Sequence, residues 1–166
     1  MKKLAVLFLT ILLGLGFSFS PTSVKAESVD NGNFVDVDSS SADLYNSNGD
    51  NLGRKVPKNS TWYLGKTISI KNTDYYQVAT DEYLSSKDSY TFSNRPEVIK
   101  VSSTDGDVPL YDHNFVQLSD VALAPGTSWY SDRVIFTPDG MPFVRVATDE
   151  YVGMWYVMQQ EFSAKL

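Results

Sequence analysis

The hexapeptide Val-Ala-Thr-Asp-Glu-Tyr occurs twice in this chain, at residues 78–83 and again at residues 146–151. Each occurrence is preceded by aromatic and β-branched residues. An exact repeat of six residues in the same context indicates an internal duplication, and repeats are the first feature to establish in an unfamiliar sequence. The chain is therefore expected to contain two copies of one small module, each stabilised by its own core or by packing on the other.

Alignment outward from the hexapeptide extends the duplication over most of residues 34–158. The offset between corresponding residues drifts only from 64 to 68, and the insertions fall in predicted turns, where loops tolerate them. The corresponding segments are 34–37 and 98–101, 44–45 and 110–111, 56–63 and 123–130, 67–69 and 134–136, and 75–78 and 143–146.

Both copies have the pattern of short β-strands. Residues 67–70 alternate polar and apolar side chains, which is the period of a strand. Clusters of turn-forming residues separate the runs, including an Asp139-Gly140 pair that favours a type I′ hairpin. Because no segment after residue 26 shows helical periodicity with a cap, we predict an all-β chain. A unit of about 60 residues with about five strands is expected to form a small, SH3-like, partly open barrel.

The sequence also predicts the boundaries of the modules. Residues 27–33 are polar and rich in Asn and Gly, and are expected to be a flexible leader. The first module is expected at 34–96 and the second at 97–166. The junction is placed at Asn94-Arg95-Pro96, because a proline disfavours the continuation of regular structure.

The N-terminus has the features of a secretory signal peptide. Lys2 and Lys3 precede an apolar run at residues 4–19, and Val24-Lys25-Ala26 places small residues at the two positions that determine cleavage. We therefore predict a signal peptide at 1–26 and a secreted mature chain. No second apolar run is long enough to cross a membrane. The absence of cysteine excludes a disulfide framework, zinc-thiolate sites and thiol catalysis.

Charge is distributed unevenly between the two copies. The chain has 14 basic and 20 acidic side chains, and removal of residues 1–26 leaves 11 and 20, a net charge of −9. Residues 43–100 carry a net +1, whereas residues 101–166 carry −6. An acidic second half repels phosphates, so nucleic acid is not expected as a partner.

The order of the repeated residues resembles the S-layer protein A (SLAP) domain of lactobacilli. The shared pattern is Leu-Tyr, a proline-containing turn before Trp-Tyr, and an aromatic-Val-Arg-Val strand that runs into Ala-Thr-Asp-Glu-Tyr-Val. It is clearest over Leu123–Val152, and residues 56–84 form a second match. The resemblance implies a secreted cell-surface protein whose paired modules attach non-covalently to cell-wall polysaccharide or teichoic acid.

The resemblance also directs attention to basic and aromatic residues. Wall-binding domains of that family are typically basic, as attraction to anionic polymers requires, and only the first copy retains clustered cations. A solvated surface is the alternative for these cations. Trp62 and Trp129 occupy corresponding positions and are expected to be core or rim anchors rather than sugar platforms. The candidate ligand-binding residues are Arg54, Lys55, Lys58, Lys66 and Lys71, together with Tyr63, Tyr75 and Tyr130.

Catalysis and metal binding are not expected. The adjacent acids Asp149-Glu150, like their counterparts in the first hexapeptide, point opposite ways on an extended chain and cannot flank one glycosidic bond. Turn-capping or surface roles are more consistent with their repetition. His113 is the only histidine and is expected to be exposed in a polar loop, so a histidine-based triad or transition-metal cluster lacks partners. An EF-hand register would place Val101 at a ligand position.

Two functions remain open from the sequence. The first is a non-enzymatic, envelope-associated protein without cofactor or metal, which binds wall polymer through paired modules. The second is a secreted protein-binding or adhesin module whose acidic second half meets a basic partner, such as another surface protein.

Overall fold

The computed structural model describes residues 33–160. The predicted signal peptide and nearly all of the predicted leader lie outside these residues, as do residues 161–166. Within the described range no helix is long and apolar enough to cross a membrane.

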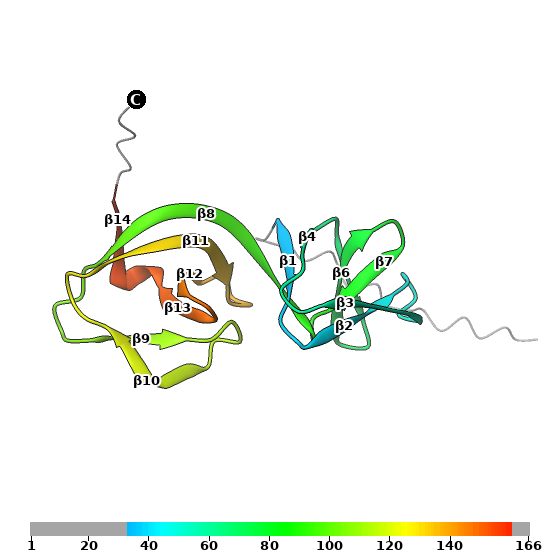
Figure 1. Cartoon of the computed structure of the whole chain (residues 1–166), viewed down its shortest axis with the longest axis horizontal. Coiled ribbons are helices and arrows are strands. Elements are labelled where there is room, and N and C mark those ends of the chain that lie inside the picture. The colour runs from blue at the N-terminus through cyan, green and yellow to red at the C-terminus, as the bar shows by residue number, and fades with distance from the viewer. Residues whose placement is uncertain (1–32, 161–166) are drawn as a thin grey trace, which may run out of the picture.

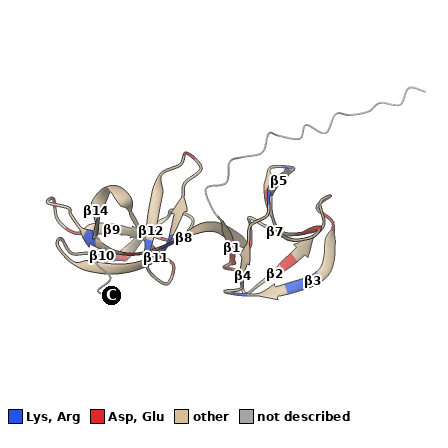
Figure 2. Cartoon of the chain, turned by 90° about the horizontal axis from the view of Figure 1, so that it is seen from above, with Lys and Arg blue, Asp and Glu red and all other residues tan. Residues whose placement is uncertain are grey.

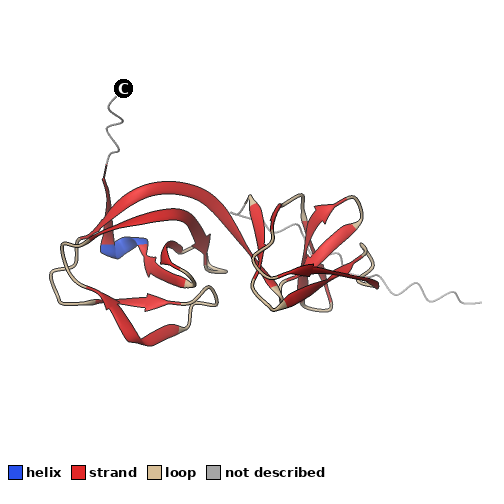
Figure 3. Cartoon of the chain, viewed as in Figure 1, coloured by secondary structure: helices blue, strands red, loops and turns tan. Residues whose placement is uncertain are grey.

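Apart from one 3-10 turn, the regular structure of the described chain is all β-strand, joined by loops and turns (Figure 3), as the sequence predicts. The first half contains β1 (Phe34–Val37), β2 (Ser41–Tyr45), β3 (Asn51–Pro57), β4 (Thr61–Tyr63), β5 (Thr67–Ile70), β6 (Thr73–Ala79) and β7 (Glu82–Ser85). The second half contains β9 (Val108–Tyr111), β10 (Gln117–Leu123), β11 (Ser128–Phe136), β12 (Pro142–Ala147), β13 (Glu150–Gly153) and β14 (Val157–Gln160). Strand β8 (Ser89–Val101) connects them, and a single 3-10 turn, η1 (Met154–Tyr156), precedes β14.

The strands form two antiparallel sheets. One has the order β3-β2-β7-β6-β5, and the other has the order β10-β9-β13-β12-β11-β8-β1-β4, with β14 paired to β8. Strand pairing closes neither sheet, so the expected SH3-like or partly open barrel stays a prediction. Figure 1 shows the two halves side by side, with β8 arching from one over the other.

Strand pairing in the second half repeats that in the first. The order β3-β2-β7-β6-β5 corresponds to β10-β9-β13-β12-β11. The residue pairs correspond too: Phe34 is opposite Tyr63, and Val98 is opposite Tyr130. In the second half one strand, β11, replaces both β4 and β5. The offsets between these pairs are those of the sequence alignment.

The repeated hexapeptide forms the turn between two strands in each half. Asp81 and Asp149 have positive φ values of 53° and 56°, a conformation that Asp tolerates better than most residues. Each carboxylate accepts a backbone hydrogen bond from another turn: from Ser47 N at 2.9 Å and from His113 N at 3.0 Å. The predicted turn role is confirmed for Asp81 and Asp149, whereas Glu82 and Glu150 are the first residues of β7 and β13.

Each half has its own apolar core, and a third cluster joins them. The first core includes Val35, Leu44 and Leu84, and the second includes Ile99 and Val152. These side chains alternate along their strands, because successive residues of a strand point to opposite faces. The third cluster is largely aromatic and contains residues of both halves, namely Phe92, Ile135, Phe143 and Tyr151, with Phe34, Tyr90, Tyr111 and Phe115 packed against them.

The expectation that regular structure stops at Asn94-Arg95-Pro96 is wrong, because β8 runs through it without interruption. Its partner β11 pairs Ser131 with Glu97 but Arg133 with Asn94, so two residues of β8 lie opposite one residue of β11. Pro96 therefore falls in a β-bulge, one of the few places where a strand accommodates a residue without an N–H donor. The predicted module boundary at residue 96 lies inside this shared strand.

Candidate functional site at the junction of the two halves

The five basic candidates do not form one patch. Arg54 and Lys55 lie on β3, whereas Lys71 lies in the turn after β5, and these strands are opposite edges of the five-stranded sheet. Figure 2 shows basic segments at separate places on this half. Lys58 and Lys66 lie in the turns before and after β4.

Two of these cations also have acidic neighbours. Arg54 pairs with Glu82 at 2.5 Å, and Lys55 lies 3.7 Å from Asp43. These contacts partly neutralise the charge that the sequence suggested for an anionic polymer.

The three tyrosine candidates differ in exposure. Tyr63 is 79% exposed, with its ring 5.0 Å from Phe34, and Tyr130 is 61% exposed at the corresponding position of the second half. Tyr75 is half-buried and packs edge-on against Tyr45 at 5.2 Å. Tyr63 and Tyr130 are therefore the tyrosines whose rings are most open to a ligand.

Trp62 and Trp129 are each held by the turn that precedes them. The indole N–H of Trp62 donates to Ser60 Oγ at 3.2 Å, and that of Trp129 donates to Thr127 Oγ1 at 2.8 Å. The same contact in both halves agrees with the expected role of rim anchors.

A surface hollow of about 210 Å³ lies beside the exposed ring of Tyr130. Its wall includes the first three residues of the second hexapeptide. The lining residues are Tyr130, Asp132, Arg145, Val146, Ala147 and Thr148. The hollow combines an aromatic ring with a few convergent polar groups, and it is smaller and more open than the pockets that enclose drug-sized ligands.

A fork-like ion pair forms the polar side of the hollow. Arg145 Nε donates to Asp132 Oδ1 at 2.8 Å, and Arg145 Nη2 makes a second short contact to Asp132 Oδ2. In the first half Gly65 and Gln77 occupy these positions, and a Cβ atom on Gly65 would lie only 2.8 Å from Gln77 Oε1. The ion pair is therefore specific to the second half.

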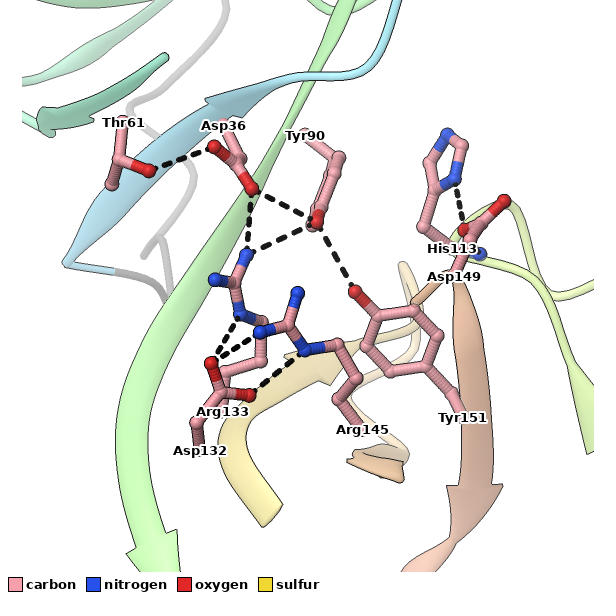
Figure 4. Close-up of polar contacts among 9 residues, drawn as sticks. All are labelled: Asp36, Thr61, Tyr90, His113, Asp132, Arg133, Arg145, Asp149 and Tyr151. Carbon is pink, nitrogen blue, oxygen red and sulfur yellow. Dashed lines mark hydrogen bonds and ion pairs between the residues drawn. The ribbon is translucent and has the colours of Figure 1, made fainter. Parts of the chain in front are cut away.

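A buried polar network continues from the hollow into the junction (Figure 4). Arg133 Nη1 donates to Asp36 Oδ2 at 2.7 Å and to Tyr90 Oη at 3.2 Å. Tyr90 donates to the same Asp36 oxygen at 3.3 Å and accepts from Tyr151 at 3.2 Å. Thr61 donates to the other Asp36 oxygen at 2.8 Å. Charge-assisted hydrogen bonds of this kind are stronger than neutral ones.

The junction holds these groups in defined charge states. Burial raises the pKa of Tyr90 and, even more, that of Tyr151, so both hydroxyls stay protonated at neutral pH. Burial, the largest single influence, would lower the pKa of Arg133, but the hydrogen bond to Asp36 and the charge interactions with Tyr90, Asp132 and Asp36 together raise the pKa. The Arg133 guanidinium also lies 3.9 Å from the centre of the Phe92 ring, which adds a cation–π contact.

The expectation that His113 is exposed is wrong. Its side chain is 11% exposed and stacks on Tyr90 with ring centres 4.8 Å apart. Nε2 lies 2.6 Å from Asp38 Oδ2, and Nδ1 lies 2.7 Å from Asp149 Oδ1. Within residues 33–160, no three His, Asp or Glu side chains are arranged to hold a metal ion.

Sequence reasoning missed Asp36, Tyr90, Asp132 and Arg133. Asp36 fits the polar face of an alternating strand, so its burial could not be read from the sequence pattern. The sequence also contains no signal that Arg133, 97 residues away, is its partner.

Residues 39–85 match the model of the Surface layer protein A domain, a segment that spans β2 to β7. This match falls on the first copy, whereas the sequence pattern was clearest over residues 123–152. No curated protein matches the chain. The first half therefore carries a domain similar to that of surface layer protein A, which associates the chain with the cell surface.

Proposed function

We propose that this protein is secreted and attaches non-covalently to a cell-wall glycopolymer, acting by binding and without a catalytic step. The match of residues 39–85 to the Surface layer protein A domain carries the proposal. We also propose that residues 97–160 are a second, diverged copy of that domain. The recurrence of strand order and residue pairs in the second half supports this.

The two halves are proposed to contribute different contacts. The hollow beside Tyr130 presents an exposed ring and the Asp132–Arg145 pair, which suits a sugar ring with hydroxyl groups. The Asp132–Arg145 pair has no net charge, so this hollow favours a glycosyl unit over a phosphate. Lys58 and Lys66, in turns of the first half, are available for longer-range attraction to an anionic polymer.

Sedimentation with purified cell walls tests the attachment. The secreted form, residues 27–166, should sediment with intact walls and less with walls stripped of teichoic acid. Tyr130→Ala should weaken binding about tenfold, the equivalent of roughly 1.4 kcal/mol. Tyr63→Ala is the matched control, because its half lacks the Asp132–Arg145 pair. Failure of the unmodified protein to sediment with either preparation would refute wall attachment.

A protein partner is the second candidate, and the acidic surface of the second half favours it. Asp105, Asp107, Asp120 and Asp139 are all exposed there. Binding to cells that persists after polymer extraction, and disappears after protease treatment of the cells, would support this candidate over wall polymer.

A further inference from the structure

The only histidine of the chain lies between carboxylates of the two halves. His113 is in the turn between β9 and β10. Asp38 directly follows β1 in the first half, and Asp149 belongs to the β12–β13 turn in the second. One ring nitrogen lies 2.6 Å from Asp38 and the other 2.7 Å from Asp149.

A count of protons shows what this arrangement requires. A neutral imidazole has one N–H donor, whereas an ionised carboxylate can only accept. Two nitrogens that each contact a carboxylate oxygen therefore need one proton at each contact, and an imidazolium supplies both. A proton on Asp38 would serve the same bond. In either case the closed arrangement contains one proton more than a neutral histidine between two carboxylates.

The other neighbours of the ring do not remove this requirement. Asn114 Nδ2 lies 3.0 Å from His113 Nε2 and could donate to it, but Asp38 would still lie against the bare nitrogen lone pair. Tyr90 covers one face of the ring, and its hydroxyl is engaged with Asp36. The charged groups in contact with the ring are the two carboxylates.

The histidine is present in only one of the two corresponding turns. In the first half Ser47 occupies the position of His113, and its backbone N–H makes the same hydrogen bond to Asp81 that His113 makes to Asp149. The turn is thus built without a histidine in the first half. The imidazole occurs only in the copy whose turn contacts the other half.

We propose that His113 is a protonation-dependent clamp between the two halves. Uptake of one proton ties the Asp38 segment to the Asp149 turn, and loss of that proton removes the contact to Asp38. Since the closed clamp contains the proton, mass action makes its contribution larger in acid and smaller as the pH rises. Histidine is the side chain whose charge ordinarily changes within the pH range that proteins encounter.

The clamp also reaches the hollow of the second half. Asp149 directly follows Thr148, which lines that hollow. Closure of the clamp therefore fixes one side of the hollow relative to the first half. The clamp itself rests on the histidine contacts and not on wall attachment, so it can be tested without a ligand.

A double-mutant cycle in the full chain tests the clamp. Unfolding by urea is measured for the unmodified protein, His113→Gln, Asp38→Asn and the double variant, at about pH 5 and about pH 8. We expect the two sites to be coupled about fivefold in the unfolding equilibrium constant at the acidic pH and to be uncoupled at the alkaline pH. Ring ¹⁵N shifts of the single histidine should show both nitrogens protonated in acid.

The control cycle pairs His113→Gln with Asp43→Asn, a carboxylate of the first half that faces Lys55 instead of the ring. It should show no coupling at either pH. Coupling of His113 to Asp38 that is equal at both pH values would indicate ordinary packing and overturn the clamp. Absence of coupling in acid would overturn it as well.

Discussion

Asp36 and Arg133 lie 97 residues apart in the chain and meet at 2.7 Å in the junction between the two halves. Both residues are less than a tenth exposed. Asp36 lies on β1 in the first half and Arg133 on β11 in the second, two strands that flank β8 in one sheet. The pair therefore ties together two copies of a module that β8 already connects covalently.

Removal of one partner from this pair should destabilise the whole described fold. Asp36→Asn removes the nearer of the two carboxylates beside the buried Arg133 guanidinium and leaves only Asp132 at 3.4 Å, so we expect a loss of about 3 kcal/mol in the free energy of unfolding. Asp43→Asn is the control, because Asp43 faces an exposed lysine and should cost less than about 1 kcal/mol. Urea denaturation at neutral pH measures both. Equal losses for the two variants would contradict a structural role for the buried pair.

The buried tyrosines of the same network predict a loss of stability in alkali. The pKa of Tyr151 is raised from its ordinary value of 10.0, mainly by burial, and that of Tyr90 is raised for the same reason. Above pH 10 the unfolded chain releases these protons while the folded chain retains them. Their contribution to stability is therefore complete below pH 10 and declines as the pH rises beyond it.

Tyr151→Phe tests whether the buried tyrosines cause this loss of stability in alkali. It removes one titrating hydroxyl, so the fall in unfolding free energy above pH 10 should become shallower than in the unmodified protein. Thermal denaturation followed by circular dichroism across this range measures the slope. An unchanged slope in Tyr151→Phe would show that the buried Tyr151 hydroxyl does not cause the fall in unfolding free energy. Tyr63→Phe, at an exposed position, should leave the slope as it is.

The elements of each half could be predicted from the sequence because their signals are local. Alternation of side chains indicated the strands, and the repeated Asp-Glu indicated a turn that the structure contains in both halves. The offset between copies followed from an exact hexapeptide. Each of these signals lies within a few residues of the feature that it predicts.

The junction could not be predicted because its determinants are distant or context-dependent. Pro96 is an ordinary strand breaker unless a bulge accepts it, and the bulge exists only through the register of β11. His113 is polar and lies in a loop, yet a stacked tyrosine from the other half covers its ring. The Asp36–Arg133 contact depends on how the two halves pack, which no local pattern records.

Glu97, a buried carboxylate on β8, gives a further prediction. Glu97 is 4% exposed and lies 2.7 Å from Arg95 Nε, while neither of its carboxylate oxygens has a hydrogen-bond donor in the described part of the chain. Arg95→Ala should therefore cost about 2 kcal/mol, because the carboxylate is left buried without a cation.

Replacement of both partners distinguishes this cause from a loss of packing. Arg95→Ala combined with Glu97→Val removes the buried charge and places a β-branched residue in the strand. Most of the lost stability should return, since a buried ion pair can be replaced by apolar groups with little cost. A double variant that is less stable than Arg95→Ala alone would show that Glu97 stabilises the strand in another way.

Gly153 provides a test of packing at the end of β13. Its backbone is extended, with φ −63° and ψ 132°, so alanine fits the backbone. A Cβ atom there would nevertheless overlap the indole ring of Trp155. Trp155 is 48% exposed and packs edge-on against Phe143 at 5.0 Å. Gly153→Ala should therefore push the indole into solvent and cost about 1–2 kcal/mol.

The Trp155→Ala background separates this overlap from any other effect of the new methyl group. In that background Gly153→Ala has no ring to displace, so its cost should fall to nearly zero, and the two substitutions should be strongly non-additive. Additive costs for Gly153→Ala and Trp155→Ala would show that the indole does not pack over Gly153 in solution.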